Sequence, residues 1–462
     1  MVILEEDKLK LKHLLSHVSM EAERFKKDSI AEPVEEQYFK WIYDSPSYDS
    51  NGQLILGPGQ GEYFKKKVWY TAAFLPKILA ESDAVFKDTA DYFIFKGFFK
   101  DGTRLLEYFI GRALHKYLYS SISDEELNTL IDNFLKELNG ELLNCYADIE
   151  LYGVNTIPER IDINSIISIR RTKVEDVAKE LELSTISIHN SPAFYTPSCI
   201  IQIKVPTNDF NEIQKLCQKT VCLLMLFDVG SVVWSNINTR KDYVNLSLFG
   251  GKLSANKTIY TFNKYVLKDE DISRLKDFFE KFSKILPENM YWTHGVKQDD
   301  VLIAYKRYCA ALLEEGTIEK RIANIIAGLE KIFIKADNIE VGYKLKVRVS
   351  RFFHFIGFNG IRVKKNILIG YDIRSIYAHG GVLTDEDKSK YAKEYIPLED
   401  LYRELANYLR MSILMMLLSE YTSDMLIQNM EESLLDRKKE DNLIKKLSQW
   451  KSLLLGTNNL KL

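Results

Sequence analysis

Arg374 and His379 lie five positions apart and have the two side-chain types that can cleave RNA without a metal ion. An imidazole exchanges protons near neutral pH, so it can serve the 2′-hydroxyl or the leaving oxygen as general base or acid. A guanidinium stabilises the negative charge that builds on phosphorus during the reaction. These residue types predict metal-independent cleavage of RNA, with products that end in a 2′,3′-cyclic phosphate and a 5′-hydroxyl.

The spacing of this pair is a weak signal when it is taken alone. With 17 arginines and 7 histidines in the chain, a match by chance is expected, and a second match occurs at Arg348 and His354. His354 stands between Phe353 and Phe355, which predicts a histidine in the hydrophobic core. Spacing alone does not separate the two pairs, so the residues that flank each pair are needed as a second criterion.

The residues that follow His379 supply such a distinction. Residues five apart on a straight helix point about 140° away from each other. Arg374 and His379 can therefore reach one phosphate only if the helix ends between them. Gly380-Gly381 predicts a helix end here, because glycine readily adopts the left-handed conformation found at helix C-termini.

A basic stretch precedes the pair, between residues 344 and 374, in a chain whose formal net charge is only -2. Its cations could neutralise phosphates, and the aromatic residues between them could stack on unpaired bases. In the alternative interpretation, the phenylalanines belong to the core and the cations simply face water. The candidate RNA-binding residues are Lys344, Lys346, Arg348, Arg351, Arg362, Lys364 and Lys365.

The remaining motifs are poor candidates for chemistry. Gly57–Gly61 and Gly250–Lys252 lack the glycine spacing and the Ser or Thr of phosphate-binding loops. His13 and His17 have the spacing of metal ligands on a helix, but no third ligand is nearby. The five cysteines form no CxxC pair. We therefore expect neither a metal ion nor a cofactor.

The distribution of prolines divides the chain. Nine of the ten prolines lie at or before Pro287 and only Pro397 follows, and proline is excluded from helix interiors. The predicted fold class is α+β, with a mixed N-terminal region followed by an all-α helical bundle. We expect a mostly helical region over 1–146, an α+β region with a possible sensor or regulatory role over 147–290, and a helical domain over 297–462.

Hydrophobic periodicity predicts the individual elements. We expect helices in the first 40 residues, over much of 62–145, and at 209–227, 318–333, 343–349 and from 398 onward. Turn formers predict a loop at 43–61. Strands are expected at 161–169, 199–205 and 244–249.

Three segments of the helical part resemble the Apea-like HEPN family. They are Tyr371-Asp-Ile-Arg-Ser followed by His379-Gly-Gly, Ala327-Gly-Leu-Glu-Lys-Ile-Phe333, and Tyr343-Lys-Leu-Lys-Val-Arg348, and the resemblance covers about residues 300–425. It implies a helical bundle that dimerises face to face. Many members are metal-independent endoribonucleases in toxin–antitoxin, abortive-infection and CRISPR-associated defence.

The resemblance also implies roles for particular residues. Arg374 and His379 would be the catalytic pair, and Ser375 would be the small polar residue that follows the arginine. Asp372 and Tyr371 would support the site. The implied protein is an endoribonuclease in antiviral defence that works as a homodimer, with an RNA substrate and an unidentified activating ligand or protein for the N-terminal region.

Composition predicts a soluble cytoplasmic protein without a membrane partner. Hydrophobic residues make up 46% of the chain, no apolar run approaches the roughly 20 residues that cross a bilayer, and acidic residues stand where a signal peptide needs positive charge. The main alternative to a ribonuclease is a non-catalytic adaptor that dimerises and binds nucleic acid or a protein. No combination of residues in 60–290 favours a metal-dependent nuclease.

Overall fold

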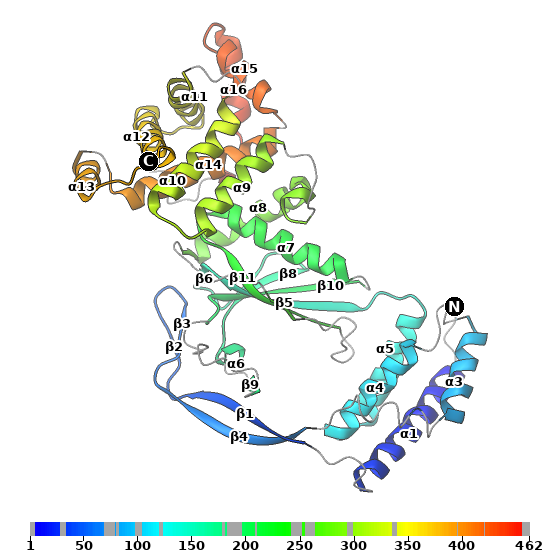
Figure 1. Ribbon diagram of the computed structural model, residues 1–462. Coiled ribbons are helices and arrows are strands. Elements are labelled where there is room, and N and C mark those ends of the chain that lie inside the picture. Colours follow the sequence, from blue (N-terminus) through cyan, green and yellow to red (C-terminus); the bar gives the residue numbers. More distant parts are fainter. Residues whose placement is uncertain are drawn as a thin grey trace.

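The computed structural model has an α+β fold with a mixed N-terminal region and a helical C-terminal part, which confirms the predicted class. Figure 1 shows a sheet between a small group of helices on one side and the C-terminal helices on the other. None of the described helices has the length and apolar character that crossing a membrane requires. The described residues are 5–27, 34–68, 79, 83–97, 104–119, 123–177, 181–182, 196–207, 210–241, 252–254, 264–292, 299–334, 340–394, 396–419 and 421–454.

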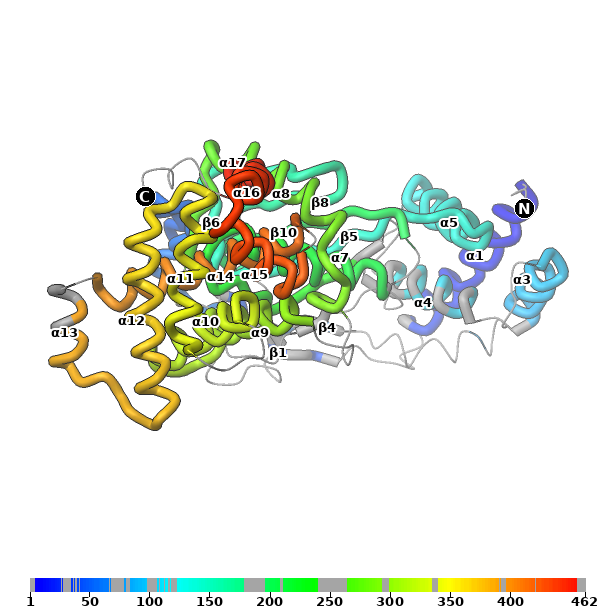
Figure 2. Tube along the Cα trace, turned by 90° about the horizontal axis from the view of Figure 1, so that it is seen from above, coloured from blue at the N-terminus to red at the C-terminus, as the bar shows by residue number. Residues whose placement is uncertain are grey.

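A small helical unit with its own core lies near the N-terminus. Leu14, Phe93 and Ile131 are fully buried in this core, which is separate from the core of the rest of the chain. The unit lies at the opposite end of the molecule from α11 and α12 in both Figure 1 and Figure 2. Its helices are α1 (Glu5–Lys27), α3 (Asp83–Phe95), α4 (Arg104–Tyr119) and α5 (Asp124–Leu138).

A β-hairpin interrupts this helical unit and corrects two predictions. Strands β1 (Val34–Tyr43) and β4 (Gly59–Val68) pair antiparallel over their whole length, so the first 40 residues are not all helical. The predicted loop at 43–61 includes the start of β4 and the short strands β2 (Ser47–Tyr48) and β3 (Leu54–Ile55). The aromatic and β-branched residues of β1 favour a strand once β4 is available to pair with it. Strand β9 (Leu181–Glu182) also pairs with β1.

The central sheet has six strands in the order β12-β11-β5-β10-β8-β7, and all its pairs are antiparallel. The strand at 199–205 is confirmed as β10, and 244–249 lies outside the described residues. The segment 161–169 is not one strand as expected, because a turn divides it into the antiparallel strands β7 and β8. The strands are β5 (Asn144–Tyr152), β7 (Arg160–Asp162), β8 (Ile167–Arg171), β10 (Cys199–Pro206), β11 (Val233–Lys241) and β12 (Lys252–Ser254).

One face of this sheet is apolar and packs against helices. Alternate residues of β5, such as Ala147, Ile149 and Leu151, are fully buried in the same cluster as α7 and α8. The opposite face is polar, as is usual for an antiparallel sheet with one solvated side. The other elements of this region of the chain are β6 (Val154–Thr156), α6 (Val174–Val177), α7 (Phe210–Phe227), β13 (Tyr265–Leu267), η3 (Asp269–Asp271), α8 (Ile272–Ile285) and η4 (Glu288–Met290).

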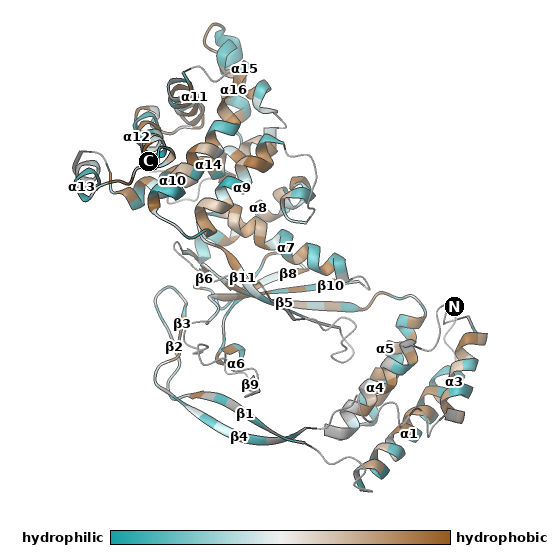
Figure 3. Cartoon of the chain, viewed as in Figure 1, coloured by the Kyte–Doolittle hydropathy of each residue, from teal (hydrophilic) through white to brown (hydrophobic). Residues whose placement is uncertain are grey.

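The chain after residue 299 is helical in its described parts, as predicted. The repeating apolar residues at 318–333 form α10, and 343–349 lies within a helix rather than a strand. Figure 3 shows α14 as largely hydrophobic, and most of its residues are buried. The helices are α9 (Asp300–Leu313), α10 (Ile318–Phe333), α11 (Val341–Phe355), α12 (Gly360–Ala378), α13 (Asp385–Glu394), α14 (Leu398–Ser419), α15 (Ser423–Glu432), α16 (Arg437–Ser448) and α17 (Lys451–Leu454).

A buried arginine joins the helical part to the α7 side of the sheet region. Arg410 of α14 is 2% exposed and donates hydrogen bonds to the carbonyl oxygens of Leu226 and Phe227 at the end of α7. It also donates to the carbonyl oxygen of Leu454. The larger hydrophobic cluster extends across residue 290, from the sheet to the C-terminal helices.

Candidate active site at the end of α12

A glycine allows α12 to lie close to α10. A Cβ atom added at Gly370 would lie 2.9 Å from Cδ1 of Ile326 and 2.8 Å from Cδ1 of Leu405. A larger residue would therefore require these two side-chain ends to shift. One turn further along both helices, Arg374 of α12 reaches Glu330 of α10. Gly370 thus lies where α12 packs closely on α10 and α14, one turn before Arg374.

Arg374 is fixed on one side and open on the other. Its Nη2 donates to Oε2 of Glu330 at 3.3 Å, and its guanidinium lies 5.8 Å from the centre of the Tyr371 ring. Its side chain is 35% exposed, and within the described part of the chain its other N–H groups have no partner. The guanidinium can therefore receive an anion from solvent while it stays bound to Glu330.

Glu330 is the carboxylate that holds Arg374, and sequence reasoning did not select it as a site residue. Burial raises the pKa of Glu330, and the neighbouring Arg374 opposes that shift. Its Oε1 is buried and has no hydrogen-bond partner among the described residues. The available signal was an acid within an apolar helical stripe, because Glu330 follows Ile322 and Ile326 at intervals of four and precedes Phe333 by three.

The glycine pair ends α12, as the sequence predicted. Gly380 has a φ of 77°, and its N–H donates to the carbonyl oxygen of Tyr377 at 3.0 Å. The N–H of Gly381 donates to the carbonyl oxygen of Ile376 at 2.9 Å. These two bonds form a Schellman motif, which satisfies the last carbonyl groups of the helix.

As expected, α12 ends between Arg374 and His379, because Ala378 is its last residue and His379 is its C-cap. The N–H of His379 donates to the carbonyl oxygen of Ser375 at 3.1 Å, and the last helical residue is Ala378. His379 still donates this helical bond, so its Cα continues the path of the last turn. Because residues five apart on a helix point about 140° away from each other, the two side chains leave this end of α12 in different directions.

His379 belongs to an exposed stripe along α12 that also contains two of the predicted supporting residues. The stripe residues follow one another at intervals of three or four, which places them on one helix face. Asp372 is exposed here. Partial removal of its carboxyl from water raises the pKa of that group, and the positive charge of Lys346 lowers it by a smaller amount. The third supporting residue, Tyr371, packs beside Arg374 instead. The stripe consists of Ile361, Lys365, Leu368, Asp372, Ser375 and His379, of which Ser375 is half-buried and the others are exposed.

The predicted RNA-binding residues do not form one group of equivalent cations. Three arginines of the set are engaged by carboxylates of neighbouring helices, which compensates their charge. Those partners anchor α11 to α15 and α16, and α12 to α14. The pairs are Arg348 with Glu431, Arg351 with Glu440, and Arg362 with Glu404.

The lysines of the same set are more accessible. Lys364 and Lys365 are exposed on α12, and no carboxylate of the described residues pairs with them. Lys346 lies 5.3 Å from the centre of the Tyr343 ring, and Lys344 is half-buried on α11. The cations most available to a polyanion are therefore the two lysines of α12.

His354 is not a core residue, which corrects the sequence-based expectation. Phe352, Phe353 and Phe355 are buried, whereas His354 points away from them and is exposed. Each residue on a helix is turned by about 100° from the next, so a histidine between buried phenylalanines can still face solvent. His354 lines an open groove of about 760 Å³ between α11 and the start of α12, together with Lys364.

No group of three or more metal-ligating side chains occurs within the described ranges of the chain. His13 is exposed and His17 is partly exposed on α1, and neither belongs to a larger cluster.

No family model, no curated protein and no solved structure matches this sequence or fold.

Proposed function

We propose that this protein is a metal-independent endoribonuclease of the HEPN type that acts as a homodimer, in the setting of antiviral defence. The observation that carries the proposal is the environment of the Arg374 guanidinium, which is bound on one side and exposed on the other. This guanidinium is held by the partly buried carboxylate of Glu330, and its other N–H groups have no partner among the described residues. The exposed imidazole of His379 ends the same helix. A phosphate and a proton-transfer group can therefore meet at this end of α12.

In the proposed mechanism, Arg374 stabilises the charge that develops on the phosphorus, and His379 transfers protons as general base or acid. Cleavage needs both a base and an acid, and one chain supplies one His379. A two-fold dimer places two copies of each residue at one site. Since Arg374 and His379 diverge within a chain, we propose that Arg374 of one copy acts with His379 of the other.

Exposed hydrophobic side chains near this end of α12 support a dimer there. Tyr343 is 60% exposed, Tyr377 is 40% exposed and Val382 is 70% exposed. Burying such side chains against a second copy is favourable, because apolar surface leaves water. A dimer through this region would also cover part of the exposed stripe that carries His379.

Cleavage in the presence of EDTA tests the absence of a metal from the mechanism. The purified protein is expected to degrade single-stranded RNA in EDTA and to leave duplex DNA intact, because the proton transfers come from side chains. Activity that appears only after magnesium or manganese is added would contradict the proposal. The variant His379→Ala serves as the negative control for contaminating nucleases.

Mixing wild-type and inactive chains tests the shared site. Because one site uses both copies of His379, a re-equilibrated equal mixture of wild type and His379→Ala should keep about a quarter of wild-type activity, the fraction of dimers with two wild-type chains. A mixture that keeps about half of the activity, while a tagged His379→Ala chain co-purifies with wild type, would mean that each chain cuts on its own and would contradict this arrangement.

A non-catalytic adaptor is the second candidate, and one observation favours it. The ion pair between Arg374 and Glu330 can serve simply to stabilise the packing of α12 on α10. In that case the helical part would only dimerise and bind a partner. RNA that stays intact in EDTA and in magnesium, together with a dimer of normal stability, would favour this second function.

A further inference from the structure

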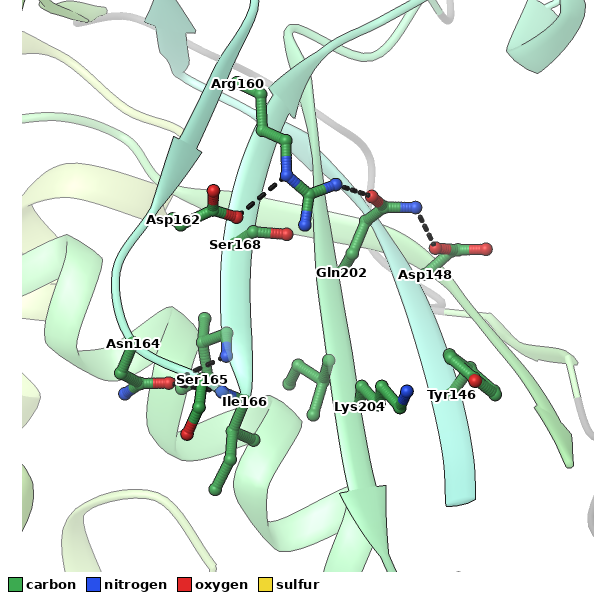
Figure 4. Close-up of a pocket in the computed structure, with 12 residues that line it drawn as sticks. Tyr146, Asp148, Arg160, Asp162, Asn164, Ser165, Ile166, Ser168, Gln202 and Lys204 are labelled. Carbon is green, nitrogen blue, oxygen red and sulfur yellow. Dashed lines mark hydrogen bonds and ion pairs between the residues drawn. The ribbon is translucent and has the colours of Figure 1, made fainter. Parts of the chain in front are cut away.

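The polar face of the central sheet carries a pocket that the proposed nuclease does not use. It has a volume of about 550 Å³, within the range of about 300–1,000 Å³ that is common for small-molecule sites. Its walls come from β5, β7, β8 and β10 and from the turn that joins β7 to β8. Figure 4 shows the side chains that line it.

A chain of hydrogen bonds crosses this pocket and fixes its polar groups. Nε of Arg160 donates to Asp162 at 2.8 Å, and Nη1 donates to Oε1 of Gln202 at 3.0 Å. Nε2 of Gln202 then donates to Oδ1 of Asp148 at 3.0 Å. Figure 4 shows Arg160 extending across the strands to Gln202. The network orients the guanidinium and both carboxylates in advance of any ligand.

Several polar groups in the pocket remain unused. Ser168 lines the pocket and is only 4% exposed, yet its hydroxyl has no hydrogen-bond partner among the described residues. Nη2 of Arg160 has no partner there, and Lys204 has no carboxylate partner there. The hydroxyl of Ser168 on β8 and the free guanidinium N–H of Arg160 on β7 are donors suited to an anion, and Lys204 adds positive charge to the pocket. Their presence in one pocket points to the anionic end of a ligand.

The β5 side of the pocket offers different chemistry. Asp148 and Tyr146 lie on the same face of β5, two residues apart, and Lys204 is directly opposite Tyr146 on β10. A carboxylate accepts a hydrogen bond from an exocyclic amino group of a base, and an aromatic ring stacks on a base. Asp148 is two strands away from Ser168, a distance of roughly 10 Å. A ribose and a base ring can span that distance.

We propose that this pocket binds a nucleoside monophosphate whose base carries an exocyclic amino group. The phosphate contacts Arg160 and Ser168, and the amino group donates to Asp148. Two carboxylates balance two cations in the pocket, and this neutrality selects against the higher charge of a triphosphate. The site is independent of the nuclease proposal, because binding can be measured without any cleavage.

Calorimetric titration of the full chain with matched nucleotides tests the proposal. AMP or CMP should bind saturably, and IMP or UMP, in which a carbonyl replaces the amino group, should bind at least about tenfold more weakly. Adenosine and inorganic phosphate should each bind more weakly than AMP. The absence of saturable binding of AMP and CMP up to about 5 mM, or equal binding of AMP and IMP, would overturn the proposal.

Substitutions then assign the two ends of the pocket. Arg160→Gln should weaken AMP binding at least about tenfold and leave the weak binding of adenosine unchanged. Asp148→Asn should remove the preference for AMP over IMP. Arg24→Gln is the matched control, because Arg24 is an exposed arginine of α1 whose side chain is 56% exposed, close to 52% for Arg160. Circular dichroism and melting curves confirm folding, and unchanged AMP affinity in folded Arg160→Gln would overturn the assignment.

Discussion

Two arginine–histidine pairs lie on neighbouring helices of this protein, Arg348 with His354 on α11 and Arg374 with His379 near the end of α12. Both histidines are exposed, and in both pairs the residues diverge around their helix. The arginines differ. Arg348 is 13% exposed, and its guanidinium binds the carbonyl oxygen of Phe333 and a carboxylate of α15. Arg374 is 35% exposed and makes a single hydrogen bond to the described residues.

The comparison shows which feature distinguishes a structural arginine from a candidate catalytic one. Sequence spacing and histidine exposure are alike in the two pairs, so neither separates them. The number of guanidinium N–H groups that remain unpaired does separate them. Arg348 joins the end of α10 to α15, whereas Arg374 is oriented by Glu330 and its other N–H groups have no partner among the described residues.

The largest expected effect is on cleavage. Arg374→Ala and His379→Ala should each lower the rate of RNA cleavage at least about hundredfold, because each removes a group that acts in the transition state. Arg348→Ala and His354→Ala should retain the activity per folded molecule. Single-turnover rates on one RNA, corrected for the folded fraction, compare the four variants. An inactive His354→Ala beside an active His379→Ala would reverse the assignment of the pairs.

The next effect concerns stability at the structural arginine. Arg348→Ala should lower the free energy of unfolding by about 1–3 kcal/mol, because it removes the hydrogen-bond donor to the carbonyl oxygen of the buried Phe333. Urea denaturation measures the change. Arg437→Ala is the control, since Arg437 is exposed on α16, and it should change stability by less than about 0.5 kcal/mol. Equal effects would mean that Arg348 does not anchor α11.

The third prediction is a pH dependence at Arg374. Burial raises the pKa of Glu330 above its ordinary 4.5, so the folded state binds the proton more tightly than the unfolded state. This contribution to stability is fully present below pH 4.5 and is lost as the pH rises through the folded pKa. Removing Arg374 raises that pKa further, so the loss extends over a wider window.

Arg374→Ala should therefore lose more stability at pH 7 than near pH 4.5, where protonation of Glu330 compensates for the missing guanidinium. Denaturation curves at the two pH values give the difference. The double variant Arg374→Ala with Glu330→Gln removes the titrating group and should lack this pH dependence. The same loss at both pH values would show that Glu330 is not coupled to Arg374 in solution.

A smaller effect is expected from the unpaired lysines of α12. Lys364→Ala with Lys365→Ala should weaken RNA binding and reduce the salt-dependence slope by about 1.4, since each lost contact to single-stranded RNA contributes about 0.7. Lys438→Ala with Lys445→Ala on α16 is the matched control, because both of those lysines are also exposed. Binding isotherms over a range of salt concentrations measure the slopes. An unchanged slope would assign the α12 lysines to an ordinary solvated surface.

The sequence correctly predicted helices, strands and helix ends that are determined by residues close together in the chain. A regular apolar repeat predicted α10 at 318–333, and Thr317 caps it with a side chain that accepts from the N–H of Lys320. The strand expected at 199–205 is β10, and the glycines at 380 and 381 end α12 as predicted. In each of these cases, the residues that determine the structure lie within a few positions of one another.

The errors and omissions arise where distant residues meet. β1 became a strand because it pairs with β4, a partner that periodicity within residues 34–43 does not reveal. Glu330 and Arg374 are 44 positions apart, and only the packing of α12 on α10 joins them. The pocket on the sheet face similarly depends on strand register, which sets Ser168 beside Gln202.

His354 provides the last and smallest prediction, because its sequence neighbours and its environment disagree. Its flanking phenylalanines predicted a core position, but the side chain is exposed. His354→Ala should therefore change the free energy of unfolding by less than about 0.5 kcal/mol. Phe353→Ala, one residue away and fully buried, should cost about 3–5 kcal/mol, because it leaves a cavity in the core. Urea denaturation of both variants measures the contrast. A loss of more than about 1 kcal/mol in His354→Ala would mean that α11 is turned about its axis relative to the described packing.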